Sequence, residues 1–382
     1  MVQVSELCNI SKGKKVKILN ERTKDSIPYL LINTLRGMEP KFFTEDKKYT
    51  EAVPEDILIV ADGANSGLVG TEVSGAVGST ILRIRINVDD LDKNYLSYFL
   101  KSKFDKMNHD LKGTGIPHLK SKEMMEMEIR KPGLSEQQRI VSAIETQFSK
   151  LDETIDNLKF VRVKLKTYRA SVLKKAFERK ESWEEKKLDE ICEKITDGSH
   201  NPPRKKEDGK RMLSARNIFN GKLVLDSFRY ISDEDFELEN KRTDVKENDI
   251  LLTTVGTIGR SLVVKKEYLP FTLQRSVSVL KPNSNISSYY LHYFLLNPEI
   301  QNFLNKNSRG VAQKGIYLNI VRKIKIALPL IEEQEKIVQS IEEKFSVIDK
   351  VEEAVDKGLK KAEQLRKSIL KIAFKGRLVK NG

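Results

Sequence analysis

The fold of this chain is decided by a stretch that occurs twice. Residues 132–150 read PGLSEQQRIVSAIETQFSK, and residues 329–347 read PLIEEQEKIVQSIEEKFSV. The two copies align without a gap as far as residues 180 and 377. Loops tolerate insertions whereas packed helices do not, so a gapless similarity of this length predicts one long regular element in each copy.

The spacing of the apolar residues indicates that this element is a helix. Apolar side chains recur mostly every three or four positions, which is the period of one helix face. They are Ile140, Ile144, Phe148, Leu151, Ile155, Leu158, Leu165, Tyr168 and Val172 in the first copy, and Ile337, Ile341, Phe345, Ile348, Val355, Leu359, Ala362, Leu365 and Ile369 in the second. The stripe is narrow and the remaining surface is charged, which is typical of a coiled-coil seam.

The charges predict how the two helices pair. Residues 134–157 and 331–356 are acidic on balance, and residues 158–180 and 357–377 are basic. In a parallel pair, like charges would face each other along the whole length. In an antiparallel pair each acidic half meets a basic half, and flanking charges of this kind set the orientation of coiled coils.

The rest of the chain is repeated as well, in the same order and with slowly growing offsets. Residues 6–8 correspond to 190–192, residues 56–58 to 249–251, and residues 95–100 to 290–295. Short apolar runs at 56–60, 81–86, 250–254 and 276–280 read as strands, and residues 92–111 and 287–306 read as helices. The sequence therefore predicts an α+β protein with domains at 1–131 and 181–328, and long helices at 132–180 and 329–382. The two tandem mixed α/β domains are separated by an antiparallel coiled coil, with pseudo-two-fold symmetry.

Composition limits the class of function. The 382 residues carry 69 Lys and Arg against 55 Asp and Glu, and a net charge of +14 favours a polyanionic partner. No apolar run approaches the roughly 18 residues of a membrane span, and no secretion signal opens the chain, so we expect a cytoplasmic protein. Two isolated cysteines, Cys8 and Cys192, are too few for a disulfide framework or a zinc site.

Catalytic motifs are weak or missing. Asn201-Pro202-Pro203 resembles part of an adenine methyltransferase motif, but Arg204 stands where an aromatic residue stacks on the flipped base. Glu239-Asn240-Lys241, with Asp226 upstream, fits the tail of a nuclease motif, but it lies in the polar stretch 233–242. No glycine-rich loop for S-adenosylmethionine or ATP is present, and His109, His118, His200 and His292 lack metal-ligand spacing. The sequence predicts a chain without catalytic or metal-binding residues.

The order domain–helix–domain–helix resembles the specificity subunits of type I restriction–modification systems, and the resemblance covers essentially the whole chain. Its most specific elements are Pro132–Gln137 and Pro329–Gln334, which open the helices, and Leu173–Phe177 and Leu370–Leu378, which close them. Asp249–Leu252 with Gly256, and Ile195–His200, resemble recurrent segments of target-recognition domains. In the first half, Ser11-Lys12-Gly13-Lys14 stands in place of Asp197-Gly198-Ser199-His200.

The resemblance implies a non-catalytic subunit that reads a split sequence in double-stranded DNA. It also implies two methyltransferase subunits and two ATP-driven restriction subunits as partners, with S-adenosylmethionine, ATP and Mg²⁺ on those partners and no cofactor on this chain. Two alternatives stay open at this point. One is the specificity subunit of a methylation-only or type II-like two-subunit system, and the other is a self-contained adenine methyltransferase.

Candidate DNA contacts follow from side-chain chemistry. Arg, Asn and Gln can read base edges, whereas Lys mostly holds phosphate. In the first domain the candidates are Asn65, Ser66, Thr114 and His118; in the second they are His200, Arg204, Lys205, Arg216, Asn217, Thr257, Arg260, Gln274, Arg275, Arg309, Gln313 and Lys314.

Overall fold

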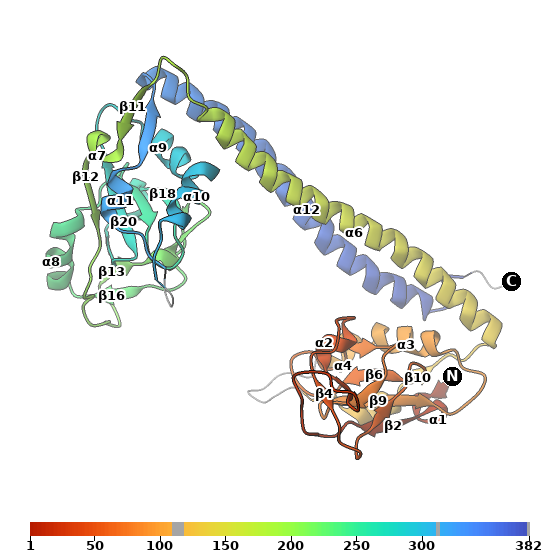
Figure 1. Ribbon diagram of the computed structural model, residues 1–382. Coiled ribbons are helices and arrows are strands. Elements are labelled where there is room, and N and C mark those ends of the chain that lie inside the picture. The colour runs from red at the N-terminus through yellow and green to blue at the C-terminus, as the bar shows by residue number, and fades with distance from the viewer. Residues whose placement is uncertain (109–117, 311–313, 380–382) are drawn as a thin grey trace. The chain divides into compact units, whose positions relative to one another are not determined.

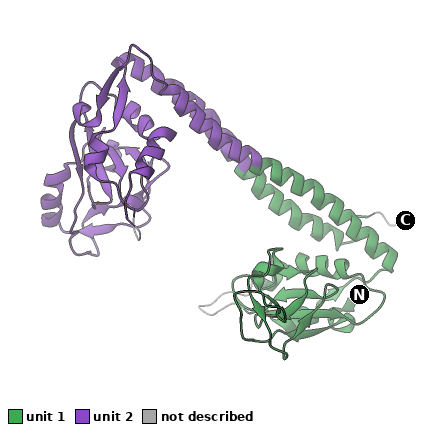
Figure 2. Cartoon of the chain, viewed as in Figure 1, with its two compact units in different colours: residues 1–159, 356–382 green, residues 160–355 purple. Residues whose placement is uncertain are grey.

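The computed structural model describes residues 1–108, 118–310 and 314–379. The chain forms two compact units, one made of residues 1–159 and 356–382 and the other of residues 160–355 (Figure 2). Each unit combines one mixed α/β domain with part of each long helix. We refer to them as unit 1 and unit 2.

The two long helices are α6 (Leu134–Ala176) and α12 (Ile331–Ala373), each of 43 residues (Figure 1). They pack antiparallel in both units. In unit 1 Asp152 of α6 pairs with Arg366 of α12, and in unit 2 Arg169 of α6 pairs with Asp349 of α12. The antiparallel arrangement predicted from the charges is therefore confirmed.

The same aromatic contact accompanies each of these ion pairs. The guanidinium of Arg366 lies 4.5 Å from the ring centre of Phe148, and that of Arg169 lies 4.4 Å from the ring centre of Phe345. Phe148 and Phe345 occupy matching positions in the two copies, as do Arg169 and Arg366. The duplication read from the sequence is thus kept at the level of individual side-chain contacts.

Unit 1 contains two four-stranded sheets. The antiparallel sheet has the order β2 (Cys8–Lys12), β9 (Ile81–Ile86), β6 (Ile57–Val60) and β7 (Val69–Gly70). The second has the order β4 (Phe43–Thr44), β3 (Ile27–Leu30), β8 (Gly75–Val77) and β5 (Glu51–Ala52). β1 (Val2–Gln3) pairs with β10 (Glu128–Ile129), and the helices are α1 (Val4–Leu7), α2 (Ile32–Leu35), α3 (Lys93–Ser102), α4 (Phe104–Asn108) and α5 (Ser121–Met125).

Unit 2 repeats this plan. Its antiparallel sheet has the order β12 (Cys192–Asp197), β20 (Val277–Pro282), β17 (Ile250–Thr253) and β18 (Ser261–Val263). The second sheet has the order β16 (Arg229–Ile231), β13 (Lys210–Leu213) and β19 (Phe271–Leu273). β11 (Glu184–Lys187) pairs with β21 (Lys325–Leu328), and the helices are α7 (Leu188–Ile191), α8 (Asp233–Thr243), α9 (Ser288–Leu295), α10 (Pro298–Lys306) and α11 (Leu318–Arg322).

Unit 2 also carries a β-hairpin, β14 (Ile218–Phe219) with β15 (Lys222–Leu223). Residues 31–56 of unit 1, all of them described, form no such hairpin and no helix as long as α8. The two domains therefore share a framework and differ in what is inserted between its strands.

The strands predicted from apolar runs are present as β6, β9, β17 and β20, whereas the two predicted helices are each interrupted. The first is split into α3 and α4, with residues 109–111 outside the described part of the chain, and the second into α9 and α10. In the second, Pro298 lacks the N–H that a continuous helix needs, and the Asn297 side chain caps α10 by accepting from Glu299 N. The prediction of a single long helix was therefore wrong at both places.

Each domain is fixed to the long helices by a buried glutamine. Gln334 is fully buried; its side chain accepts from Ser287 N at 2.8 Å and donates to the carbonyls of Asn285 and Pro329, both at 2.9 Å. Gln137 makes the corresponding three hydrogen bonds in unit 1. The glutamine of each helix-opening motif therefore ties the domain to the start of its helix.

Candidate nucleic-acid interface

Several loops of unit 2 meet at one edge of its sheets. β12 and β17 both pair antiparallel with β20, so they run in the same direction, and β13 runs parallel to β19. The loops that follow β12 and β19 are joined by a hydrogen bond of 2.8 Å from Ser199 N to Leu273 O. Gln274 N donates to Leu213 O at 2.8 Å and Thr254 N donates to Ser276 O at 3.0 Å, which brings in the ends of β13 and β17.

Close approach of these backbones requires a glycine after β12. A Cβ atom at Gly198 would lie 2.1 Å from Leu273 O, far inside van der Waals contact. A side chain there would push the β12 and β19 loops apart. Gly198 therefore sets the geometry on which the rest of the interface is built.

The loops surround a cavity of about 690 Å³. Its lining residues are Ser199, His200, Pro202, Lys205, Met212, Ser214, Ala215, Arg216, Ser227, Phe228, Arg229, Val255, Gly256, Thr257, Arg260, Gln274, Arg275 and Ser276. Among these described residues are five Lys or Arg side chains and no Asp or Glu. A concave surface lined by one sign of charge attracts a polyanion, and its Gln and Ser side chains add hydrogen-bonding groups.

A second cavity, in unit 1, has a different character. It measures about 840 Å³ and lies between α3, α4 and the two long helices. Its charged lining residues are of both signs: Lys101, Arg366 and Lys367 with Glu145, Asp152 and Glu363. It contains none of the candidate DNA contacts, and its mixed charge does not favour a polyanion.

Hydrogen bonds and ion pairs hold His200 at the edge of the unit 2 cavity. Its Nε2 lies 2.9 Å from the Asp197 carboxylate, which also pairs with Arg242 of α8. Glu239, also on α8, accepts a hydrogen bond of 2.8 Å from the Ser199 hydroxyl. Glu239, one of the carboxylates that suggested a nuclease, therefore supports a loop and lies on helix α8 rather than on a strand.

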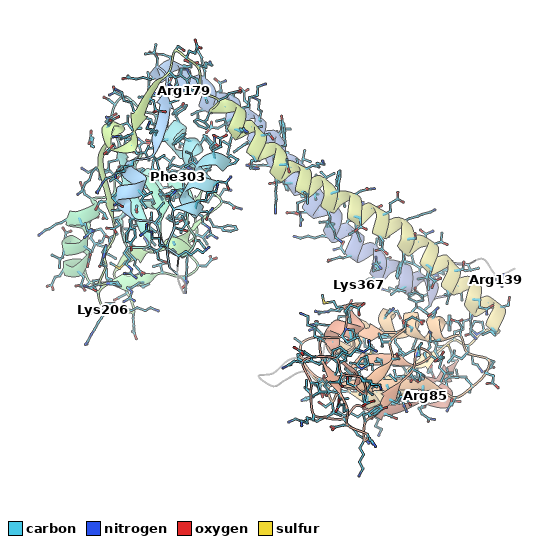
Figure 3. The ribbon with its side chains drawn as sticks, viewed as in Figure 1. Arg85, Arg139, Arg179, Lys206, Phe303 and Lys367 are labelled. Atoms are coloured by element: carbon cyan, nitrogen blue, oxygen red, sulfur yellow. The ribbon has the colours of Figure 1, made fainter. Side chains whose placement is uncertain are left out.

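The structure gathers most of the second-domain candidates. The cavity is lined by His200, Lys205, Arg216, Thr257, Arg260, Gln274 and Arg275. Arg204 is exposed in the loop after β12, and Lys206 extends from the same loop (Figure 3). Arg309 and Lys314 are both exposed. They lie beside the cavity, since Lys314 O accepts a hydrogen bond of 2.8 Å from the N–H of the lining residue Gly256. Gln313 lies outside the described residues.

Two candidates are corrected because their side chains are buried. Asn217 is 1 % exposed, and its side chain donates to the carbonyls of Val224 and Ser227 while accepting from Ser214 N. Ser66 is fully buried and donates to Ala61 O and Gly63 O. Both side chains shape loops from within, and neither is available to DNA.

Unit 1 has a corresponding edge. A Cβ atom at Gly13 would lie 2.1 Å from Gly78 O, and Gly13 N donates to Ile81 O as Gly198 N does to Val277 O. Gly13 is therefore the counterpart of Gly198. The sequence comparison had instead placed Gly13 opposite Ser199, one residue further along the chain. The exposed Lys14 and Lys15 then take the places of Ser199 and His200.

The remaining first-domain candidates lie on this edge or outside the described residues. His118 is exposed, with Nδ1 2.8 Å from the Asp62 carboxylate. Burial raises the pKa of Asp62, but hydrogen bonds from His118 and Lys12 outweigh it and hold that pKa below its ordinary value. Asn65 accepts a hydrogen bond of 2.7 Å from Arg36, and Thr114 lies outside the described part of the chain.

Sequence reasoning missed several interface residues. Arg229, Ser227 and Phe228 line the cavity, but they lie on or just before β16 and carry no turn signal. Lys14 and Lys15 could have been found, because they stand next to the glycine that both halves share.

The histidine and cysteine side chains considered as possible metal ligands include three that are buried and structural. His292 is buried with Nδ1 3.0 Å from the Ser261 hydroxyl, and burial lowers its pKa to about 4. Cys8 and Cys192 are also buried, and neither forms a disulfide. In the described ranges no three His, Cys, Asp or Glu residues gather as a metal site would require, and no helix there has the length and apolarity to cross a membrane.

Comparison with known proteins settles the family. The family model described as "Type I restriction modification DNA specificity domain" matches residues 1–159 and 180–360. The chain belongs to this family. It is 26 % identical to the type I restriction enzyme EcoBI specificity subunit of Escherichia coli, with 99 % of this chain and 85 % of that protein aligned. It is 28 % identical to the MjaVIII specificity subunit of Methanocaldococcus jannaschii, with 100 % and 93 % aligned.

Solved structures share the fold. A chain from a study of complex assembly and conformational transition of the type I R-M system superposes with a TM-score of 0.75, at 17 % identity, covering 98 % of this chain and 97 % of that one. The HsdS subunit from Thermoanaerobacter tengcongensis superposes with a TM-score of 0.54, at 16 % identity, covering 98 % and 96 %.

Proposed function

We propose that this member of the family is the DNA-reading specificity subunit of a type I restriction–modification complex. In this proposal each α/β domain, 1–131 and 181–328, reads one half of a split target. The observation that carries it is the cavity of unit 2, which is lined by five basic side chains and no acidic one. The counterpart loops of unit 1 present Lys14 and Lys15, so both domains offer basic side chains at matching strand ends.

The chemistry belongs to partner subunits in this proposal. Two methyltransferase subunits, holding S-adenosylmethionine, and two ATP-driven restriction subunits would bind a chain whose two halves make equivalent contacts. The chain itself would position these partners on DNA, in the cytoplasm. The loop Asn201-Pro202-Pro203 would then contribute to the shape of the interface only.

Reconstitution of the chain with its cognate methyltransferase subunits tests the proposal. The complex should methylate one split sequence in random DNA, whereas the chain alone should transfer no methyl group. Asn201→Ala should leave methyl transfer by the complex intact, since the amide takes no part in catalysis. Methyl transfer by the isolated chain that Asn201→Ala abolishes would instead identify a self-contained methyltransferase.

A further inference from the structure

We infer that Arg260 reads a guanine in the half-site of the second domain, and that the β14–β15 hairpin holds its guanidinium in place through Phe219. The inference rests on the proposed function and assigns a base-reading residue and a positioning residue to it. Arg260 lies at the end of the loop between β17 and β18 and lines the basic cavity.

Contacts fix Arg260 at both its backbone and its side chain. Its backbone N donates to the Thr253 hydroxyl at 2.9 Å, and its Nη1 donates to Ile218 O at 3.0 Å. The guanidinium also lies over the Phe219 ring, 5.2 Å from the ring centre. Both side-chain contacts come from strand β14, so the hairpin decides where this guanidinium points.

Other arginines of the cavity are held less completely. Arg216 and Arg275 are exposed, and within the described ranges their guanidinium groups make no hydrogen bond that fixes them. Arg229 donates to Pro203 O but lies over no aromatic ring in the described structure. Exposed arginines of this kind suit phosphate contacts, whereas a held guanidinium suits the directional contact to a base edge.

The geometry left to Arg260 is that of guanine recognition. A guanidinium has five N–H donors in a fixed fork, and the bond to Ile218 O uses one of them. A two-donor edge remains for the N7 and O6 acceptors of guanine, the commonest specific contact of arginine in the major groove. Because the fork is already oriented, little side-chain freedom is lost on binding.

The hairpin itself is anchored. Asn220 and Gly221 form its two-residue turn with φ of 49° and 67°, the conformation that Asn-Gly favours between antiparallel strands. A Cβ atom at Gly221 would lie 3.7 Å from His292 Nε2, so the turn sits on a buried side chain of α9. Phe219 is nevertheless 51 % exposed, so a hydrophobic core does not account for its position.

Four variants of the full chain, each assembled with the cognate methyltransferase subunits, separate the two roles. Arg260→Ala and Arg260→Lys remove the fork, and Phe219→Leu removes the ring while keeping an apolar side chain. Phe219→Tyr restores a ring. Phe303→Leu is the matched control, because Phe303 is a 37 % exposed phenylalanine of α10 that does not line the cavity (Figure 3). Methylated sites are sequenced from a random DNA library.

Wild type should require guanine at one position of the half-site read by residues 181–328. Both Arg260 variants should lower that preference about tenfold or more at this position alone, the size of one bidentate contact. Phe219→Leu should lower it several-fold at the same position, with Phe219→Tyr and Phe303→Leu like wild type.

Three results would overturn the inference while leaving the proposed function intact. They are a second half-site without guanine, Arg260 variants that keep the full preference, and Phe219→Leu that weakens all positions equally. If wild type marks no sequence, the proposed function fails and this inference fails with it.

Discussion

Replacing the buried Gln334 by alanine should loosen unit 2 at the junction between its domain and α12. The substitution removes three hydrogen bonds at once, to Ser287 N, Asn285 O and Pro329 O. The bond to Pro329 O is itself buried, so water does not readily replace it. A buried polar group left without its partner costs more than the bond contributes when formed.

The expected loss of stability follows from these contacts. An unpaired buried group costs about 1–3 kcal/mol, and the two less buried groups recover part of that by binding water. We expect a total of about 3 kcal/mol. For a unit of roughly 200 residues this corresponds to a fall of about 6–12 °C in its Tm.

Hydrogen–deuterium exchange, followed peptide by peptide, locates the effect. Peptides covering α9 and β20 should lose protection in Gln334→Ala, while peptides of unit 1 should not change. Gln339→Ala is the matched control. Gln339 is exposed on the same helix, and its side chain donates to Glu343, so the effect should stay within about 0.5 kcal/mol. Equal effects of the two substitutions, or loss of protection in both units, would refute the reasoning.

Further predictions concern charge, thiols and pH. Arg275→Ala should weaken DNA binding at every sequence and reduce the slope of log K against log salt by about 1 in filter binding. The control Lys350→Ala, on α12, should leave the slope unchanged. Equal slopes for Arg275→Ala and wild type would contradict a phosphate contact. Burial raises the pKa of Cys192 to about 12, so this thiol should resist iodoacetamide at pH 8 until the protein unfolds, as mass spectrometry can show. Burial lowers the pKa of His292 from 6.5 to about 4, so the unfolded state binds the additional proton between these values. Stability should therefore fall by roughly 3 kcal/mol as pH drops from 6.5 to 4, and His292→Asn should remove that part of the dependence in urea unfolding.

The long helices and the strands of each core could be predicted from the sequence because their signals are local. A helical period sustained over 40 residues has no other interpretation, and a run such as Ile57–Val60 contains only apolar side chains. The antiparallel orientation also followed, since charge of one sign predominates in each half of each helix. Each of these features depends on a sequence pattern that can be recognised without knowing which distant residues come into contact.

The interface was harder to predict because it depends on which loops meet. Arg229 lies on β16 and Arg260 in the loop between β17 and β18, yet both line one cavity, and nothing local in the sequence links them. Asn217 and Ser66 have the same polar chemistry as surface residues, yet their loops fold around them. A turn-rich stretch predicts where the chain bends and leaves open which of its side chains point inward.

Exchange of one domain tests the central claim most directly. The segment 181–328 is replaced by the equivalent segment of a relative with a different target, and methylated sites of the reconstituted complex are sequenced. Because each domain carries its own strand-end loops, we expect one half of the split sequence to change and the other half to stay as in wild type. A change in both halves, or in neither, would contradict independent reading of DNA by two domains.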